Sequence, residues 1–349
     1  MRQIGLIVSA AMPDSSFDLR GRRVWVAGHR GMLGSALVRR LASEDCEILT
    51  VGREELDLGD QAAVKAWYAK MHPEVVVLAA ARVGGVLANS RYPASFLSDN
   101  LAIQDNVIQA AAARGVKKLL FVSSSCVYPR LAEQPIREQA LMTGPLEPTN
   151  VWYGVAKIAG MMQCAAYRQQ GGLDFIAAVP GNLYGPGDYF DNENSHVIPA
   201  FIRRFHDAVS SGLDEVVVWG GGTARREFVY VDECADALVF LLKNYSSGDI
   251  INIGSGLDVS IRELATLVAA VAGFTGRISF DTSKPEGAPR RLLSTDRLTS
   301  LGWQSKMSLR EGLESTYQWF LTSRAAGYVP RGFSPDDGGR DVADQKEGR

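Results

Sequence analysis

Tyr153 and Lys157 are four residues apart, a spacing that brings two side chains together on one face of a helix. A phenol beside an ammonium group can deliver a proton to a carbonyl oxygen, because the neighbouring cation favours the phenolate. One element earlier, Ser124 follows an apolar run that ends at Val122. Ligands of parallel α/β sheets bind at such strand ends. The three side chains together predict proton transfer to a carbonyl group that receives a hydride.

Cys126 and His196 form a second pair that could do acid–base chemistry. Carbon next to a ketone is acidified, and a thiol with an ordinary pKa of about 8.5 could remove its proton. His196 lies in the polar, loop-like sequence Asn194–Pro199 and could supply an acid on the opposite side. Taken singly, a buried structural cysteine and a structural loop histidine remain the alternatives.

Glycines 28, 31 and 34 predict a dinucleotide site. They follow the apolar run Val24–Ala27 and open a helical pattern. Glycine there permits a tight turn and close approach of the backbone to a pyrophosphate, while the helix N-terminus offers unpaired N–H groups to the anion. The spacing is G-x-x-G-x-x-G, and its position between strand and helix supports the prediction more than the pattern itself.

Arginines near this loop favour NADP over NAD. The second apolar run ends just before Arg53, where an NAD enzyme usually carries an acid for the ribose 2′-hydroxyl. Arg53 and Arg30 suit a 2′-phosphate instead. Glu54 and Glu55 are contrary signals.

The elements that must hold these residues follow an alternating pattern. Between the first two strands, 33–43 places Leu33, Leu37 and Leu41 on one helix face. Continuous apolar strands separated by helices indicate a parallel sheet covered on both faces. The strands expected in this part are Val24–Ala27, Glu47–Val51, Val75–Leu78, Leu119–Val122 and Phe175–Val179.

After about residue 185 the pattern becomes irregular, with strands expected at Val216–Trp219 and near Ile250–Ile253. Two later helices begin with capping boxes, Ser260–Glu263 and Ser308–Glu311. The predicted fold is α/β: a doubly wound, Rossmann-like parallel sheet with a smaller C-terminal α/β domain for the substrate.

The expected domain organisation divides the 349 residues into four parts. Residues 1–20 read as a flexible leader, with a signal peptide as the less favoured interpretation. The dinucleotide-binding domain comprises 21–185 plus about 225–256. The substrate-binding domain comprises about 186–224 plus 257–328. The Gly- and Asp-rich tail 329–349 is expected to be disordered.

Composition narrows the function further. There are 37 Lys+Arg against 39 Asp+Glu, so no global basic field would attract nucleic acid or an anionic membrane. The four cysteines form no C-x-x-C pair, which indicates neither a disulfide framework nor a metal site. No apolar stretch is long enough for a membrane span. We therefore expect a cytoplasmic protein without metal.

The combination of glycine loop, serine and Tyr-x-x-x-Lys resembles the extended short-chain dehydrogenase/reductase family that acts on nucleotide sugars, over roughly 22–325. Several strings are similar to those family members that epimerise GDP-4-keto-6-deoxy-mannose at C3 and C5 and then reduce C4. These strings are Gly28–Met32, Ala79–Gly85, Ser124–Pro129, Leu146–Asn150, Asn194–Pro199 and Lys284–Gly287.

The resemblance implies a role for each catalytic residue. Cys126 would remove the protons at C3 and C5, and His196 would return protons from the other face. Tyr153 would protonate the C4 oxygen during hydride transfer from NADPH. Ser124 would hold that oxygen, and Lys157 would hold the nicotinamide ribose and the phenol. The resemblance also implies a homodimer.

Binding residues are implied in the same way. A GDP-sugar substrate would contact Arg204, Trp219, Arg226 and Glu286, although Glu286 replaces the more usual Asp. NADP(H) would be bound by Gly28, Arg30, Gly31, Met32, Leu33, Gly34, Arg53, Leu56, Ala80, Ser123, Ser124, Tyr153, Lys157, Pro180, Asn182, Leu183 and His196.

Two alternatives stay open. One is a 4-epimerase or 4,6-dehydratase of nucleotide sugars that retains NAD and needs no Cys126/His196 pair. The other is an inactive NADP-sensing interaction protein, against which the intact Ser124, Tyr153 and Lys157 argue.

Overall fold

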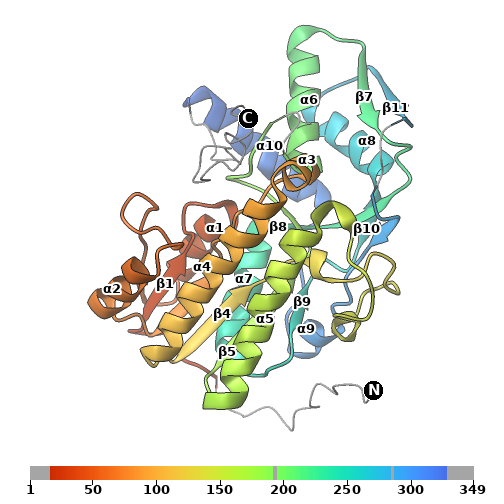
Figure 1. Cartoon of the computed structure of the whole chain (residues 1–349). Coiled ribbons are helices and arrows are strands. Elements are labelled where there is room, and N and C mark those ends of the chain that lie inside the picture. Colours follow the sequence, from red (N-terminus) through yellow and green to blue (C-terminus); the bar gives the residue numbers. More distant parts are fainter. Residues whose placement is uncertain (1–15, 192–194, 284–286, 328–349) are drawn as a thin grey trace, which may run out of the picture.

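A parallel sheet of six strands forms the larger part of the molecule (Figure 1). The computed structural model describes residues 16–191, 195–283 and 287–327. Every adjacent pair of strands in this sheet is parallel. Their order across the sheet is β2 (Glu47–Leu49), β1 (Arg23–Ala27), β3 (Val75–Leu78), β4 (Lys118–Val122), β5 (Phe175–Pro180) and β9 (Ile251–Ile253).

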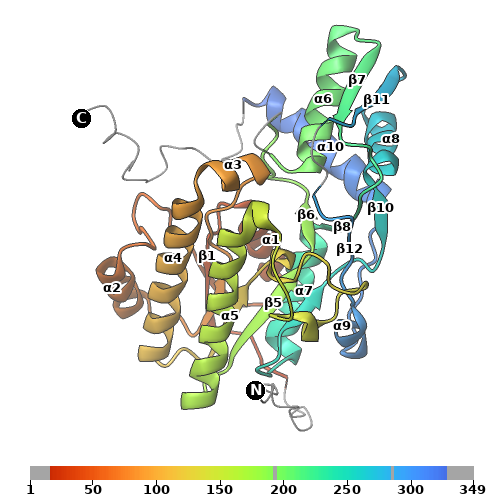
Figure 2. The ribbon, with the colours of Figure 1, turned by 45° about the vertical axis from the view of Figure 1, so that its right-hand side comes forward.

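Helices cover both faces of this sheet because successive strand residues point to opposite sides. Val24 and Val26 pack in one core cluster with helices α1 (Met32–Leu41) and α7 (Val231–Asn244). Trp25 and Ala27 pack in another, against the opposite helical layer. Figure 2 shows that layer in front of the sheet. Its helices are α2 (Gln61–Met71), α4 (Pro93–Ala113) and α5 (Val151–Gly171).

A smaller part lies at the carboxyl edge of the main sheet (Figure 1). Its central strand is β8 (Arg225–Tyr230), which pairs with β6 (Asn182–Tyr184), β10 (Asp258–Ser260) and β12 (Arg290–Arg291). A separate parallel pair and three helices complete it: β7 (Glu215–Trp219), β11 (Arg277–Asp281), α6 (Val197–Ser211), α8 (Ile261–Ala272) and α10 (Leu309–Ala325).

Strand β8 connects the two parts. It ends at Tyr230, and α7 begins at the next residue, Val231. The remaining elements are short: α3 (Val86–Arg91), α9 (Asp296–Ser300) and three 3₁₀ turns, η1 (Ser125–Val127), η2 (Glu138–Ala140) and η3 (Pro148–Asn150).

The predicted fold class is confirmed, as are the seven predicted strands. The second strand ends at Leu49, two residues earlier than expected. Both predicted capping boxes are present at the starts of α8 and α10. The proposed domain limits stay a prediction. Among the described residues, no helix is both long and apolar enough to cross a membrane.

The leader prediction was wrong for residues 16–20. Leu19 is buried in the core, and the backbone N–H of Phe17 donates to the carbonyl oxygen of Lys243 at 2.7 Å. Burial of apolar side chains holds this segment against the sheet. The rest of the predicted leader, and the predicted disordered tail, lie outside the described residues.

Candidate active site

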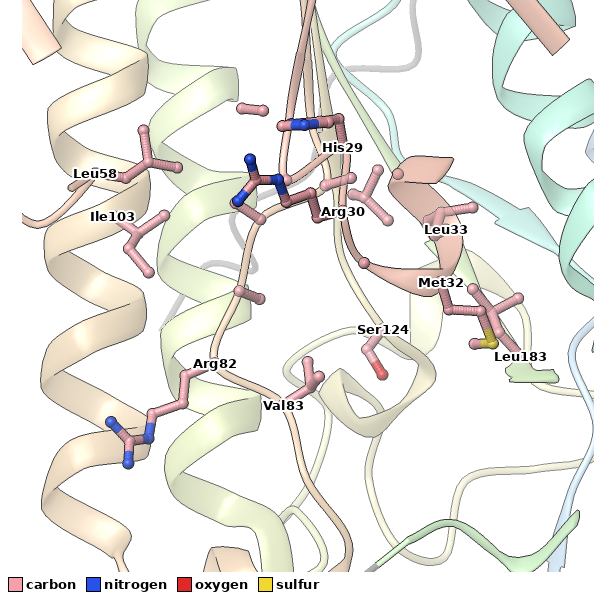
Figure 3. Close-up of a pocket in the computed structure, with 18 of the residues that line it drawn as sticks. His29, Arg30, Met32, Leu33, Leu58, Arg82, Val83, Ile103, Ser124 and Leu183 are labelled. Atoms are coloured by element: carbon pink, nitrogen blue, oxygen red, sulfur yellow. The ribbon is translucent and has the colours of Figure 1, made fainter. Parts of the chain in front are cut away.

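A cavity of about 770 Å³ opens at the carboxyl edge of the parallel sheet. It is walled by the loops that follow the first strands and by the start of α5. Every residue predicted to bind the dinucleotide lines it. Figure 3 shows Met32, Leu33 and Leu183 on one side and Leu58 and Ile103 on the other. The position matches the ligand site of doubly wound sheets.

The glycine loop fits a pyrophosphate. Gly28 has φ of +93°, and a Cβ there would lie 2.7 Å from the backbone nitrogen of Ala80. A Cβ on Gly34 would overlap the carbonyl oxygen of Gly28. Helix α1 starts after Gly31, and no side chain among the described residues caps it. The turn therefore leaves backbone N–H groups of α1 for an anion.

Tyr153 and Lys157 lie one turn apart on α5 and both line the cavity, as their spacing predicts. The Nζ of Lys157 is 5.7 Å from the centroid of the Tyr153 ring. It donates to the carbonyl oxygen of Val122, at the end of β4, over 2.9 Å. Ser124 follows on the same strand end, so strand and helix together fix the three side chains.

The electrostatics of this group differ from the expectation that Lys157 favours the phenolate. Burial, with a smaller contribution from Cys126, raises the pKa of Tyr153 well above its usual value. Burial lowers the pKa of Lys157 to about 8. The neutral phenol is thus the resting form, which is the form needed to donate a proton.

Cys126 lies in the η1 turn, beside the cavity and outside its lining. It is 7% exposed. The backbone N–H of Cys126 donates a hydrogen bond to the side-chain oxygen of Ser124 at 3.5 Å. Burial raises the pKa of the Cys126 thiol, while Ser124, Arg291 and Lys157 act in the opposite direction. The positive charges of Arg291 and Lys157 would stabilise a thiolate.

His196 is the residue preceding α6, and it lines the same cavity. The protein around it lowers the pKa of its imidazole, because desolvation disfavours the charged ring. Four of the five predicted catalytic residues therefore share one cavity. The fifth, Cys126, is two residues from Ser124.

The predicted substrate contacts are only partly brought together. Arg204 and Trp219 line a second cavity of about 330 Å³ between α6 and β7, with the guanidinium carbon 5.2 Å from the indole centroid. Arg226 lies on β8, lines neither cavity, and donates from Nη1 to the carbonyl oxygen of Arg225 at 2.8 Å. Glu286 lies outside the described residues.

The sequence analysis missed four charged residues of the main cavity: Asp57, Arg82, Asp99 and Asp188. Arg82 and Asp99 form an ion pair of 2.6 Å in its wall. Asp188 is 6% exposed, and its Oδ2 has no hydrogen-bond partner among the described residues. Burial raises its pKa to about 7. Their position in the sequence could have indicated them, because Arg82 follows strand β3 and Asp188 follows strand β6, and the cavity opens where strands end.

The fold and this arrangement can be compared with known proteins. The model of the NAD dependent epimerase/dehydratase family matches residues 24–254. The chain belongs to this family. No group of three or more His, Cys, Asp or Glu side chains in the described residues could hold a metal ion.

The relatives are close over most of the chain. GDP-L-fucose synthase of Sinorhizobium fredii is 55% identical over 307 residues, covering 88% of this chain and 98% of that protein. GDP-L-fucose synthase 1 of Arabidopsis thaliana is 54% identical over 308 residues, covering 88% and 95%. A GDP-L-fucose synthetase from Naegleria fowleri, solved with NADP bound, has a TM-score of 0.82 at 29% identity, covering 90% and 98%.

Proposed function

We propose that this chain is a GDP-L-fucose synthase. It converts GDP-4-keto-6-deoxy-D-mannose to GDP-L-fucose by epimerisation at C3 and C5 and reduction at C4. The observation that carries the proposal is one cavity lined by Ser124, Tyr153, Lys157 and His196, with Cys126 beside it, in a chain 55% identical to a protein of that name.

Epimerisation is assigned to Cys126 and His196. The thiolate of Cys126 removes the proton next to the C4 ketone, and the imidazolium of His196 returns a proton to the opposite face. The enolate oxygen needs a hydrogen-bond donor, and the hydroxyls of Ser124 and Tyr153 can both supply one. The Arg291 and Lys157 cations favour the thiolate against its burial.

Reduction is assigned to Tyr153, Ser124 and Lys157. The phenol of Tyr153 donates its proton to the C4 oxygen, and Ser124 holds that oxygen in place. Lys157 is fixed by the Val122 carbonyl oxygen and holds the ribose and the phenol. One site then performs both reactions, because the same oxygen is held in each.

The nicotinamide cofactor is proposed to be NADP(H), which supplies the hydride when bound. The uncapped start of α1 would hold its pyrophosphate. Arg30 and Arg53 line the cavity where the 2′-phosphate would lie. The structure of the Naegleria fowleri relative contains NADP.

The GDP part of the substrate is proposed to bind beside the second cavity. Arg204 is suited to a diphosphate because its guanidinium is planar and carries several donors. Trp219 is 45% exposed and offers a flat apolar surface. Arg226 and Glu286 are kept as further predicted contacts.

A homodimer through helices of each copy is also proposed. Helix α5 exposes Trp152, Val155 and Met162, which share one face of the helix. Light scattering of the purified protein should give twice the chain mass, and Trp152→Glu should give the single-chain mass. The cytoplasmic location stays a prediction.

The test of the reaction uses the purified chain with NADPH and GDP-4-keto-6-deoxy-mannose. The near-ultraviolet absorbance of NADPH should fall as a GDP-deoxyhexose forms, and NMR of the product should show inversion at C3 and C5. Without NADPH consumption the proposal fails.

Product analysis also separates the alternatives. A 4-epimerase or dehydratase that retains NAD would convert its sugar without net use of added NADPH. An NADP-sensing protein would bind NADPH and turn over no sugar nucleotide.

A further inference from the structure

Two opposite charges meet at the rim of the main cavity. Nη1 of Arg30, from the glycine loop, lies 2.5 Å from Oε1 and 2.7 Å from Oε2 of Glu54. Glu54 comes from the turn after β2. The side chains are 41% and 55% exposed. Figure 3 shows Arg30 beside His29 in the glycine loop. The pair therefore links the first and second strand ends at the edge of the site.

Gly52 provides the space for this contact. A Cβ at residue 52 would lie 2.5 Å from Oε1 of Glu54 and 2.6 Å from Oε2, closer than real Cβ contacts allow. Gly52 and Arg30 line the cavity, whereas Glu54 reaches its edge through the contact with Arg30. The turn is closed by N–H groups of Glu55 and Leu56, which donate to the carbonyl oxygen of Gly52.

This is where the adenosine ribose of a dinucleotide reaches in a doubly wound fold. A carboxylate here accepts a hydrogen bond from the ribose 2′-hydroxyl, and an arginine binds a 2′-phosphate. The chain has both, and they bind each other. A 2′-phosphate must take the Arg30 guanidinium from Glu54 and meets a negative charge as it does so.

We propose that Glu54 is a specificity-determining residue that reduces the preference for NADPH over NADH. It competes with the 2′-phosphate for Arg30 and accepts the 2′-hydroxyl of NADH. An exposed ion pair is weak, so the phosphate can displace it, but the carboxylate stays within range to repel the phosphate. This inference rests on the cofactor assignment made above.

The experiment compares Glu54→Gln with Glu55→Gln, which removes the same charge one residue away. Dissociation constants of NADPH and NADH are measured by calorimetry on the resting protein, without sugar substrate. In Glu54→Gln the ratio of the NADPH to the NADH constant should fall by about three- to tenfold. In Glu55→Gln it should stay within about twofold of the wild-type ratio.

Gly52→Ala is a second route to the same result. Its methyl group displaces the Glu54 carboxylate from Arg30, so the ratio should fall in the same direction with the charge retained. Thermal unfolding of each variant checks that it is folded. The inference is overturned if Glu54→Gln leaves the ratio unchanged, or if Glu55→Gln changes it equally.

The result is separable from the proposed reaction. If neither dinucleotide binds to any of these proteins, the cofactor assignment and this inference both fail. If the ratio shifts as expected and no sugar nucleotide is turned over, only the proposed reaction fails.

Discussion

The guanidinium of Arg291 donates a hydrogen bond to the backbone carbonyl oxygen of Ser125, with 2.5 Å between Nη1 and the oxygen. Arg291 lies on β12 of the small sheet and is 9% exposed, whereas Ser125 opens the turn that carries Cys126. The smaller part of the molecule therefore holds the turn of the proposed base and places a positive charge near its thiol.

Arg291→Met should slow alkylation of Cys126 by iodoacetamide, because loss of the cation raises the pKa of the thiol and leaves less thiolate. Solvent exchange at C3 and C5 should slow in parallel. Arg290→Met is the control, since Arg290 is the preceding residue of β12, is 43% exposed and pairs with Asp258 over 2.5 Å. Equal losses in both variants would indicate a general effect on the small sheet.

Cys126→Ala should abolish deuterium exchange at C3 and C5 and retain part of the 4-reduction. Removal of a general base lowers a rate by about 10²- to 10⁴-fold. NMR of the sugar nucleotide in deuterated water measures the exchange, and NADPH consumption measures the reduction. Cys164→Ala, a buried cysteine of α5 outside the cavity, should affect neither. Exchange that persists in Cys126→Ala would exclude the thiol as the base.

Tyr153→Phe should suppress hydride transfer by about 10²- to 10⁴-fold while exchange at C3 and C5 continues, because only reduction needs the phenolic proton. Ser124 remains to hold the enolate oxygen. NADPH binding, measured by fluorescence, should be close to that of the wild type. Loss of exchange together with reduction would show that the two roles cannot be separated.

The pH dependence of exchange should be bell-shaped and wide. Burial lowers the pKa of His196 below its usual 6.5 and raises the pKa of Cys126 above the range of about 8.5 to 9.0 that is usual for a thiol. As pH falls through the lower value both groups are protonated and the base is lost. As pH rises through the upper value both are deprotonated and the acid is lost. Rates of exchange at subsaturating substrate give the two apparent pKa values. These values belong to the Cys126/His196 pair and not to either residue alone. A profile that falls steadily between pH 6.5 and 9.0 would contradict these assignments.

Asp174→Ala should destabilise the fold by about 2–4 kcal/mol, because it leaves a buried ammonium without its carboxylate. The Nζ of Lys118 lies 2.8 Å from Oδ2 of Asp174, and the lysine side chain is 2% exposed. Chemical denaturation gives the free energy of unfolding. Glu47→Ala breaks a surface pair with Arg23 and should cost less than about 1 kcal/mol. Similar losses in the two variants would contradict the burial argument.

Much of the fold and site follows from local sequence. The spacing of Tyr153 and Lys157 places them on one helix face. The glycines from Gly28 to Gly34 predict the tight turn between the first strand and the first helix. Ser260 and Ser308 predict helix starts, because each forms a capping box with a glutamate three residues later. These predictions succeed because the interactions that decide them lie within a few residues.

Contacts between distant segments could not be predicted in the same way. Arg291 meets Ser125 across 166 positions, and nothing near either residue indicates the other. Leu19 reads as part of a loose leader, and only the assembled sheet buries it. Asp188 follows a Gly-Pro-Gly turn, where an acid usually faces solvent. Its burial depends on the surrounding chain.

Strand β8 of the small sheet continues directly into helix α7 of the larger part. At this crossing no loop residue separates Tyr230 at the end of β8 from Val231 at the start of α7. Helix α7 is tied to α1 by Asp236 and Arg40, whose Oδ1 and Nε are 2.6 Å apart. The helix whose uncapped first turn lines the main cavity is thus connected, through α7, to the central strand of the small sheet.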